Sequence, residues 1–240
     1  MKRIKVTHYF QDPSHCAVAA AATLANFHNP EIDYEKTKKI ACRKFDTKSR
    51  KISDAGIDSP EICRLLNYLG FNSVTLITSD FYCVDYTWSN YGKRKMLETI
   101  KHSLDHKKDK EEKNLTRSLY KWYKLDGYDN NIKIDYNFGK YIRKYLNKKI
   151  PIIVTFNWTM FFKYVKDGEY GDDPVNGDFT EHAVVANGYD KNGVWIVDSH
   201  HQYYKYKRKK YRKGFYKISW ENLMTVMGQG DVIIPSNYCI

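Results

Sequence analysis

Near its start the chain reads Asp12-Pro13-Ser14-His15-Cys16-Ala17-Val18-Ala19-Ala20-Ala21-Ala22-Thr23-Leu24. Pro13 fixes the entering turn, Ser14 is predicted to be the N-cap, and small residues favour a helix from about Cys16 to Phe27. The run of alanines indicates a helix packed closely against neighbours on several faces. The helix places a cysteine in its first turn, where unpaired amide hydrogens and the positive end of the helix dipole favour thiolate over thiol.

A second informative stretch lies near the other end of the chain. It reads Glu181-His182-Ala183-Val184-Val185, then Gly188-Tyr189-Asp190, and then Trp195-Ile196-Val197-Asp198. Asn192-Gly193 between two hydrophobic runs is the strongest short hairpin signal, so strands are predicted at 182–189 and 194–198. With the three-residue connection Lys191-Asn192-Gly193, His182 and Asp198 face the same side of the hairpin. A bulge is the other way to bring them together.

The remaining pattern predicts an α+β fold, because helices come first and antiparallel strands afterwards. The predicted helices are Tyr34–Phe45, Pro60–Leu69, Gly139–Leu146 and one from Ser219 through Met227. The predicted strands are Phe71–Thr78, 150–156, a pair around Gly214, and Gly230–Pro235. We expect one domain over 1–240, with a charged accessory helical segment at about 85–135.

Composition narrows the class of protein. The 240 residues are 42% hydrophobic and carry a net charge of +12. Apolar runs are too short for a membrane span, and the N-terminus lacks the pattern of a secretory signal, so we expect a cytoplasmic protein without membrane contact. Five cysteines without CxxC spacing argue against a disulfide framework. The basic charge permits binding to nucleic acid without establishing it, and Lys205–Lys213 is the candidate segment.

Four residues supply the roles that thiol attack on a carbonyl requires. Cys16 is the candidate nucleophile, His182 the base, and Asp198 the carboxylate that orients the imidazole. Gln11, five residues before the cysteine, is the candidate donor to the oxyanion. Taken singly, each has a plain structural explanation: a buried cysteine, a solvated glutamine, a histidine at a strand edge and an aspartate in a turn. Together they favour catalysis.

These residues resemble a known family. Gln-x4-Cys opening a helix, then His-Ala-Val-Val-x-x-Gly-Tyr-Asp and Val-x-Asp, is similar to the papain-like cysteine peptidases. The resemblance is strongest to the bacteriocin leader (double-glycine) peptidases and their stand-alone relatives. It implies the papain-like fold, with the nucleophile helix packed on a C-terminal antiparallel sheet, and the roles given above for Cys16, His182, Asp198 and Gln11. The family commonly has glycine after the nucleophile, where this chain has Ala17.

The predicted activity is hydrolysis of a peptide or isopeptide bond in a peptide or protein substrate, with no metal or organic cofactor. Two alternatives stay open: a papain-like acyltransferase or transpeptidase, and an inactive basic protein that binds nucleic acid or a partner. Two metal motifs are weaker. Asp172, Asp173 and Asp178 lack the ligand spacing of a calcium loop, and His200-His201 lacks partners at zinc-ligand spacing. The sequence names neither the substrate nor the oligomeric state.

Overall fold

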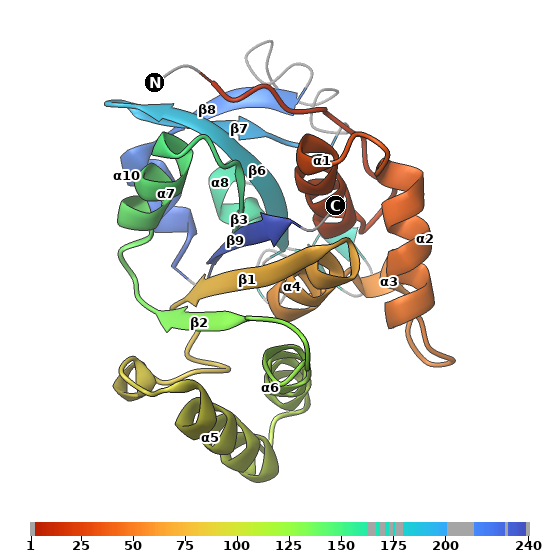
Figure 1. Ribbon diagram of the computed structural model, residues 1–240, viewed down its shortest axis with the longest axis vertical. Helices are drawn as coiled ribbons and strands as arrows, with labels where there is room; N and C mark the ends of the chain where they lie inside the picture. The colour runs from red at the N-terminus through yellow and green to blue at the C-terminus, as the bar shows by residue number, and fades with distance from the viewer. Residues whose placement is uncertain are drawn as a thin grey trace.

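A computed structural model of the protein describes residues 3–162, 167–168, 171–172, 175, 180–200, 214–228 and 230–238. Over these residues the centre is a seven-stranded sheet in the order β2-β1-β9-β3-β6-β7-β8 (Figure 1). Its strands are β1 Phe71–Thr78, β2 Asn131–Ile134, β3 Ile152–Asn157, β6 Glu181–Asp190, β7 Gly193–Val197, β8 Phe215–Ser219 and β9 Asp231–Tyr238. β1 and β2 pair in parallel, and the other neighbours in the sheet pair antiparallel. Two short strands, β4 Asp167–Gly168 and β5 Gly171–Asp172, form a separate hairpin.

Helices cover both faces of the sheet (Figure 1). On one face lie α1 Cys16–His28 and α4 Ser59–Tyr68, with α2 Tyr34–Phe45 and α3 Ile52–Ala55 outside them. On the other face lie α7 Phe138–Asn147, α8 Trp158–Phe162 and α10 Trp220–Val226. The 3-10 helix η1 Tyr86–Trp88, α5 Lys93–His106 and α6 Lys110–Tyr123 lie beyond the β2 edge, where α6 packs on α4. No helix among the described residues is long and apolar enough to cross a bilayer.

Strand alternation divides the interior into two cores. In β3, Ile153 joins the core beneath α1 and α4, whereas Val154 joins the core beneath α7 and α10. Side chains of successive strand residues point to opposite faces, so a sheet covered on both faces has nearly continuous apolar strands. In α1, every residue from Ala17 to Ala25 is buried, which agrees with the close packing predicted from its alanines.

The predicted α+β class is confirmed, and most predicted elements are present within two residues of their expected bounds. β9 runs to Tyr238, beyond the predicted end at Pro235, and α3 and α8 were not predicted. The segment 85–135, predicted as helical, also contributes β2 to the sheet. Its four residues give too short a pattern to identify a strand without the neighbouring β1.

The predicted cap of α1 is wrong. His15 is the N-cap, and Ser14 adopts a left-handed φ of 60° in the preceding turn, so its side chain does not cap the helix. The His15 amide instead closes that turn onto the Asp12 carbonyl at 3.1 Å. Because the His15 side chain bonds to the Pro13 carbonyl and caps no helix amide, the first amides of α1 remain available to the residues around Cys16.

The predicted three-residue hairpin connection is also wrong. Asp190 pairs with Gly193, so the connection has two residues, Lys191 and Asn192. That register alone would place His182 and Asp198 on opposite faces of the hairpin. A bulge between Ala186 and Gly188 shifts the register by one residue, and the two side chains then share a face.

The N-terminal segment holds this bulge in place. The Ile4 amide donates to the carbonyl oxygen of Asn187 at 2.7 Å, and the Asn187 side-chain amide donates to the carbonyl oxygen of Ile4 at 2.9 Å. The residue after the bulge, Gly188, passes close to the backbone of Arg3, so a Cβ there would lie 3.2 Å from the Arg3 Cα. The bulge therefore depends on residues at the opposite end of the chain.

Gly193 provides a stability test of the hairpin. A Cβ at this position would overlap the backbone carbonyl of Ile218 in β8, so Gly193→Ala must displace β7 from β8. We expect Gly193→Ala to lower the free energy of unfolding by about 2 kcal/mol or more in urea denaturation. Gly228→Ala is the matched control, because the nearest atom to its Cβ would be 3.8 Å away. Equal stability of the two variants would contradict the predicted clash.

Candidate active site

His182 and Asp198 form a buried hydrogen bond at the ends of β6 and β7. His182 Nε2 lies 2.8 Å from Asp198 Oδ1, and the two side chains are 4% and 1% exposed. Since Nε2 is bonded to the carboxylate, Nδ1 is the ring nitrogen that can hydrogen-bond to the Cys16 sulfur and exchange a proton with it. The register shift at Asn187 makes this contact possible.

Asp198 has further hydrogen-bond donors. The His200 amide donates to Oδ1 at 2.8 Å, and the Tyr216 hydroxyl, from β8, donates to Oδ2 at 2.7 Å. Burial alone would raise the pKa of Asp198, but the positive His182 ring and these donors outweigh it and hold the pKa below its ordinary value. Asp198 is therefore ionised and fixed in orientation.

Cys16 lies at the start of α1 and is half-buried. The sulfur is hydrogen-bonded to the His182 side chain and to the backbone amides of Ala183 and Ala17. Burial raises the pKa of the thiol, but the hydrogen bond and charge of His182, with the two amides, reverse the effect and lower the pKa. The Ala17 amide is one of the helix donors left uncapped by Ser14.

The same interactions act on the imidazole with the opposite sign. Burial lowers the pKa of His182, but the charge and hydrogen bond of Asp198, together with Cys16, raise it to about 10. At a pH above the lowered pKa of Cys16 and below the raised pKa of His182, the favoured state is a thiolate beside an imidazolium. This ion pair is the nucleophilic form that acyl transfer by a cysteine requires.

Gln11 is buried and held by the residue that follows Asp198. The Ser199 hydroxyl donates to Gln11 Oε1 at 2.8 Å, and the backbone N–H of Gln11 donates to the Ser199 backbone carbonyl at 3.1 Å. Because Oε1 is occupied, the NH2 end of the side chain is the end left for another partner. Hydrogen bonds thus connect Cys16, His182 and Asp198, and Gln11 is bonded to Ser199, the residue that follows Asp198 in the chain.

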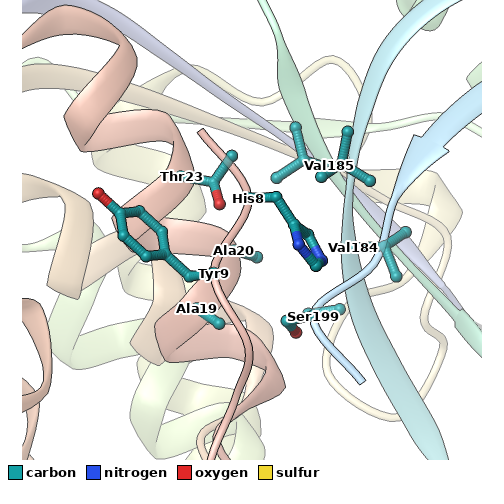
Figure 2. Close-up of a pocket in the computed structure, with 10 residues that line it drawn as sticks. His8, Tyr9, Ala19, Ala20, Thr23, Val184, Val185 and Ser199 are labelled. Carbon is teal, nitrogen blue, oxygen red and sulfur yellow. The ribbon is translucent and has the colours of Figure 1, made fainter. Parts of the chain in front are cut away.

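The crevice between the N-terminal segment, α1 and β6 is tightly filled. Figure 2 shows the His8 ring between α1 and β6, with Ser199 close to it. The crevice lined by these residues has no room for a water molecule. His8 Nε2 lies 2.7 Å from the carbonyl oxygen of Asp198. Packing and this hydrogen bond together fix the end of β7 against the N-terminal segment.

Other predicted features fall partly or wholly outside the described residues. His201, Lys205–Lys213, Asp173, Asp178 and Cys239 lie outside them, and Asp172 is described only in its backbone. His200 lies beside the site, with its ring 5.8 Å from that of His182 between centroids. Within the described part of the chain, no group of three or more histidine, cysteine, aspartate or glutamate residues is arranged to hold a metal ion.

Sequence reasoning missed three residues around the site: His8, Ser199 and Tyr216. Tyr216 carried no signal beyond a place in an alternating strand, because its partner Asp198 is 18 residues away on another strand. Ser199 follows a predicted site residue, and that adjacency was the one available clue. His8 lies 190 residues from Asp198 and carried no clue at all.

The Tyr216 hydrogen bond leads to a stability prediction. Tyr216→Phe removes a donor from a buried carboxylate, and we expect a loss of about 1.5–3 kcal/mol in the free energy of unfolding at pH 7. Because the bond stabilises ionised Asp198, whose folded pKa is lowered, the loss should shrink as the pH falls through that pKa. The control is Tyr189→Phe, which removes a hydroxyl bonded to Asn147 at an exposed site. A pH-independent loss equal to that of the control would rule out the predicted role.

Comparison with known proteins adds an independent finding. Neither curated proteins nor solved structures gave a match. A family model described as Peptidase_C39 like family matches residues 3–227, a range that contains Gln11, Cys16, His182 and Asp198. The match covers nearly the whole sequence, and the chain belongs to this Peptidase_C39-like family of peptidases.

Proposed function

We propose that the protein is a cysteine peptidase that cleaves a peptide or isopeptide bond through an acyl-enzyme. Cys16 is the nucleophile, His182 the general acid and base, Asp198 the orienting carboxylate, and Gln11 a donor to the oxyanion. Family membership supports the reaction class and a peptide substrate.

One observation carries the assignment of the residues. His182 bonds to Asp198 through Nε2 and is also hydrogen-bonded to the Cys16 sulfur. A structural histidine needs no such pair of partners, whereas a catalytic base needs a carboxylate on one side and the nucleophile on the other. The position of Cys16, a partly exposed residue beside a nearly inaccessible imidazole, supports the same assignment.

The proposed reaction has two steps, formation of a thioester and its hydrolysis. The Cys16 thiolate attacks the carbonyl carbon, and the negative charge that develops on oxygen is held by the Gln11 side-chain amide and the Cys16 backbone amide. His182 gives its proton to the leaving nitrogen, the C–N bond breaks, and a thioester remains. Water, deprotonated by His182, then attacks the thioester and releases the acid and the thiolate.

We further propose that residues 1–240 form one catalytic domain in which 85–135 is accessory. Support comes from the position of α5 and α6, which lie beyond the β2 edge of the sheet, away from α1, β6 and β7 (Figure 1). Trp122 of α6 is fully buried and donates to Asn67 at 3.1 Å, so the segment contributes to stability. Its proposed role is structural support without a part in the chemistry.

A peptide library read by mass spectrometry tests the proposed function. We expect the wild-type protein to cleave some library members, Cys16→Ala to cleave none, and Gln11→Ala to show kcat reduced by about 100- to 1000-fold. Cys42→Ala is the matched control, because it removes a half-buried thiol outside the proposed site. Unchanged cleavage by Cys16→Ala would refute the assignment.

The same assay separates hydrolysis from transfer. Added hydroxylamine or a primary amine intercepts a thioester, so an acyl-enzyme route should give a ligated product alongside the free acid. A protein that forms only the ligated product, with no acid in the absence of amine, would be the acyltransferase alternative.

A further inference from the structure

Gln11, the proposed oxyanion donor, lies in a segment that is held from two sides. Its backbone N–H donates to the carbonyl oxygen of Ser199, just beyond the end of β7, at 3.1 Å. The next backbone N–H, that of Asp12, donates instead to the hydroxyl oxygen of Tyr34 in α2, at 2.9 Å. Gln11 and Asp12 therefore connect the β6–β7 hairpin to helix α2.

The Tyr34 hydroxyl bonds to Asp12 a second time, through the side chain. It donates to Asp12 Oδ2 at 3.1 Å while it accepts the Asp12 backbone N–H. Burial of Tyr34 and the charge of Asp12 raise the pKa of the hydroxyl, so it stays protonated and can donate. Lys38, one turn further along α2, also bonds to Asp12 Oδ2. The side chains of Lys38 and Asp12 are 33% and 45% exposed, so this ion pair restrains the segment less than the buried tyrosine does.

Tyr34 is itself held firmly in place. It is the first residue of α2, it is 8% exposed, and it belongs to the core beneath α1 and α4. The side chain of the N-cap residue Asp33 accepts a hydrogen bond from the Lys36 backbone N–H at 2.8 Å, which anchors the start of the helix. A close-packed ring on an anchored helix turn has little freedom to move, so its hydroxyl holds Asp12 in one position.

The ring of Tyr34 also contacts the segment on the other side of Gln11. It stacks on Tyr9, with the ring centroids 6.3 Å apart and the ring planes at 26°. Figure 2 shows the rings of His8 and Tyr9 on opposite sides of the N-terminal segment, with His8 directed toward β6. Tyr34 thus contacts Tyr9, two residues before Gln11, and Asp12, one residue after it.

Asp12 links these contacts to the nucleophile. Its carbonyl oxygen accepts the His15 backbone N–H at 3.1 Å and closes the turn that leads into Cys16. The two proposed oxyanion donors flank this turn, because Gln11 directly precedes Asp12 and Cys16 directly follows His15. A shift of Asp12 would therefore change the spacing of the two donors, and a displacement of about 1 Å can cost about 100-fold in rate.

We propose that Tyr34 is a positioning residue for the oxyanion donors, and that it acts through its two hydrogen bonds to Asp12 and its stacking on Tyr9. The proposal rests on the proposed peptidase function, and it concerns the step in which negative charge develops on the carbonyl oxygen. Tyr34 takes no part in bond making or breaking. Loss of its hydroxyl should weaken addition to a carbonyl and leave the thiolate as reactive as before, because His182 sets the ionisation of Cys16.

Two reactions of Cys16 separate this role from a general loss of structure. p-Nitrophenyl acetate acetylates a thiolate through a tetrahedral oxyanion: the S–C bond forms, the ester C–O bond breaks, and p-nitrophenolate leaves. Iodoacetamide alkylates the same thiolate by direct displacement of iodide, and no oxyanion forms. Rates at Cys16 are obtained by subtracting those of the Cys16→Ala protein. We expect Tyr34→Phe to lower the acetylation rate about 10- to 100-fold and to leave the alkylation rate unchanged.

Tyr141→Phe is the matched control. Tyr141 lies in α7 on the opposite face of the sheet, is also 8% exposed, and donates to a carboxylate, that of Asp135, at 2.8 Å. This variant should leave both rates unchanged. Asp12→Ala is a second variant, which keeps the test available if Tyr34→Phe fails to fold. It removes the carboxylate and retains the backbone bond, so we expect a smaller loss that is confined to acetylation.

The outcomes separate this proposal from the proposed function. Acetylation of Tyr34→Phe at the rate of Tyr141→Phe, or an equal fall in acetylation and alkylation, would overturn the positioning role and leave the peptidase function standing. Unchanged acetylation of Asp12→Ala would also count against the role. If the wild-type protein is acetylated no faster than Cys16→Ala, the peptidase function is refuted, and the positioning role is refuted with it.

Discussion

The buried hydrogen bond between His182 and Asp198 is the interaction on which the proposed site depends. It keeps the imidazole charged despite burial, and the charged imidazole in turn lowers the pKa of the Cys16 thiol. A buried ion pair is stable only when its remaining hydrogen-bonding capacity is satisfied. Tyr216 and the His200 amide satisfy that of Asp198. The charges therefore depend on one another: ionised Asp198 stabilises the charged His182 ring, and the charged ring stabilises the Cys16 thiolate.

The geometry of this bond links the two ends of the polypeptide. With a two-residue hairpin turn alone, the His182 and Asp198 side chains would lie on opposite faces of the hairpin. The bulge at Asn187 shifts the register by one residue and places them on the same face. Three hydrogen bonds connect the ends of the chain: Ile4 bonds to Asn187 in the bulge, His8 bonds to the Asp198 carbonyl, and Ser199 bonds to Gln11. Residues 3–11 and the β6–β7 hairpin thus form one unit. Its parts fix the base and the oxyanion donor together, which is the preorganisation that acyl transfer needs.

Prediction from the sequence succeeded where the signal was local. The alanine run identified α1, and Asn192-Gly193 identified the hairpin within one residue at each end. It failed where the cause lies far along the chain. The bulge depends on a contact between Asn187 and Ile4, 183 residues apart, and β2 is identifiable only beside β1. For the site, the four candidate residues could be named, but neither their contacts nor the supporting Tyr216 and Ser199 could be read from spacing.

The state of the His182 ring tests the central claim most directly. We predict that 15N NMR of the labelled protein will show both ring nitrogens protonated at pH 8, with titration near the pKa of about 10 that Asp198 and Cys16 produce. The signal should report Nε2 bonded to the carboxylate and should move when Cys16 is replaced by alanine. A neutral imidazole at pH 8, titrating near the ordinary value of about 6.5, would contradict the ion pair and the mechanism built on it.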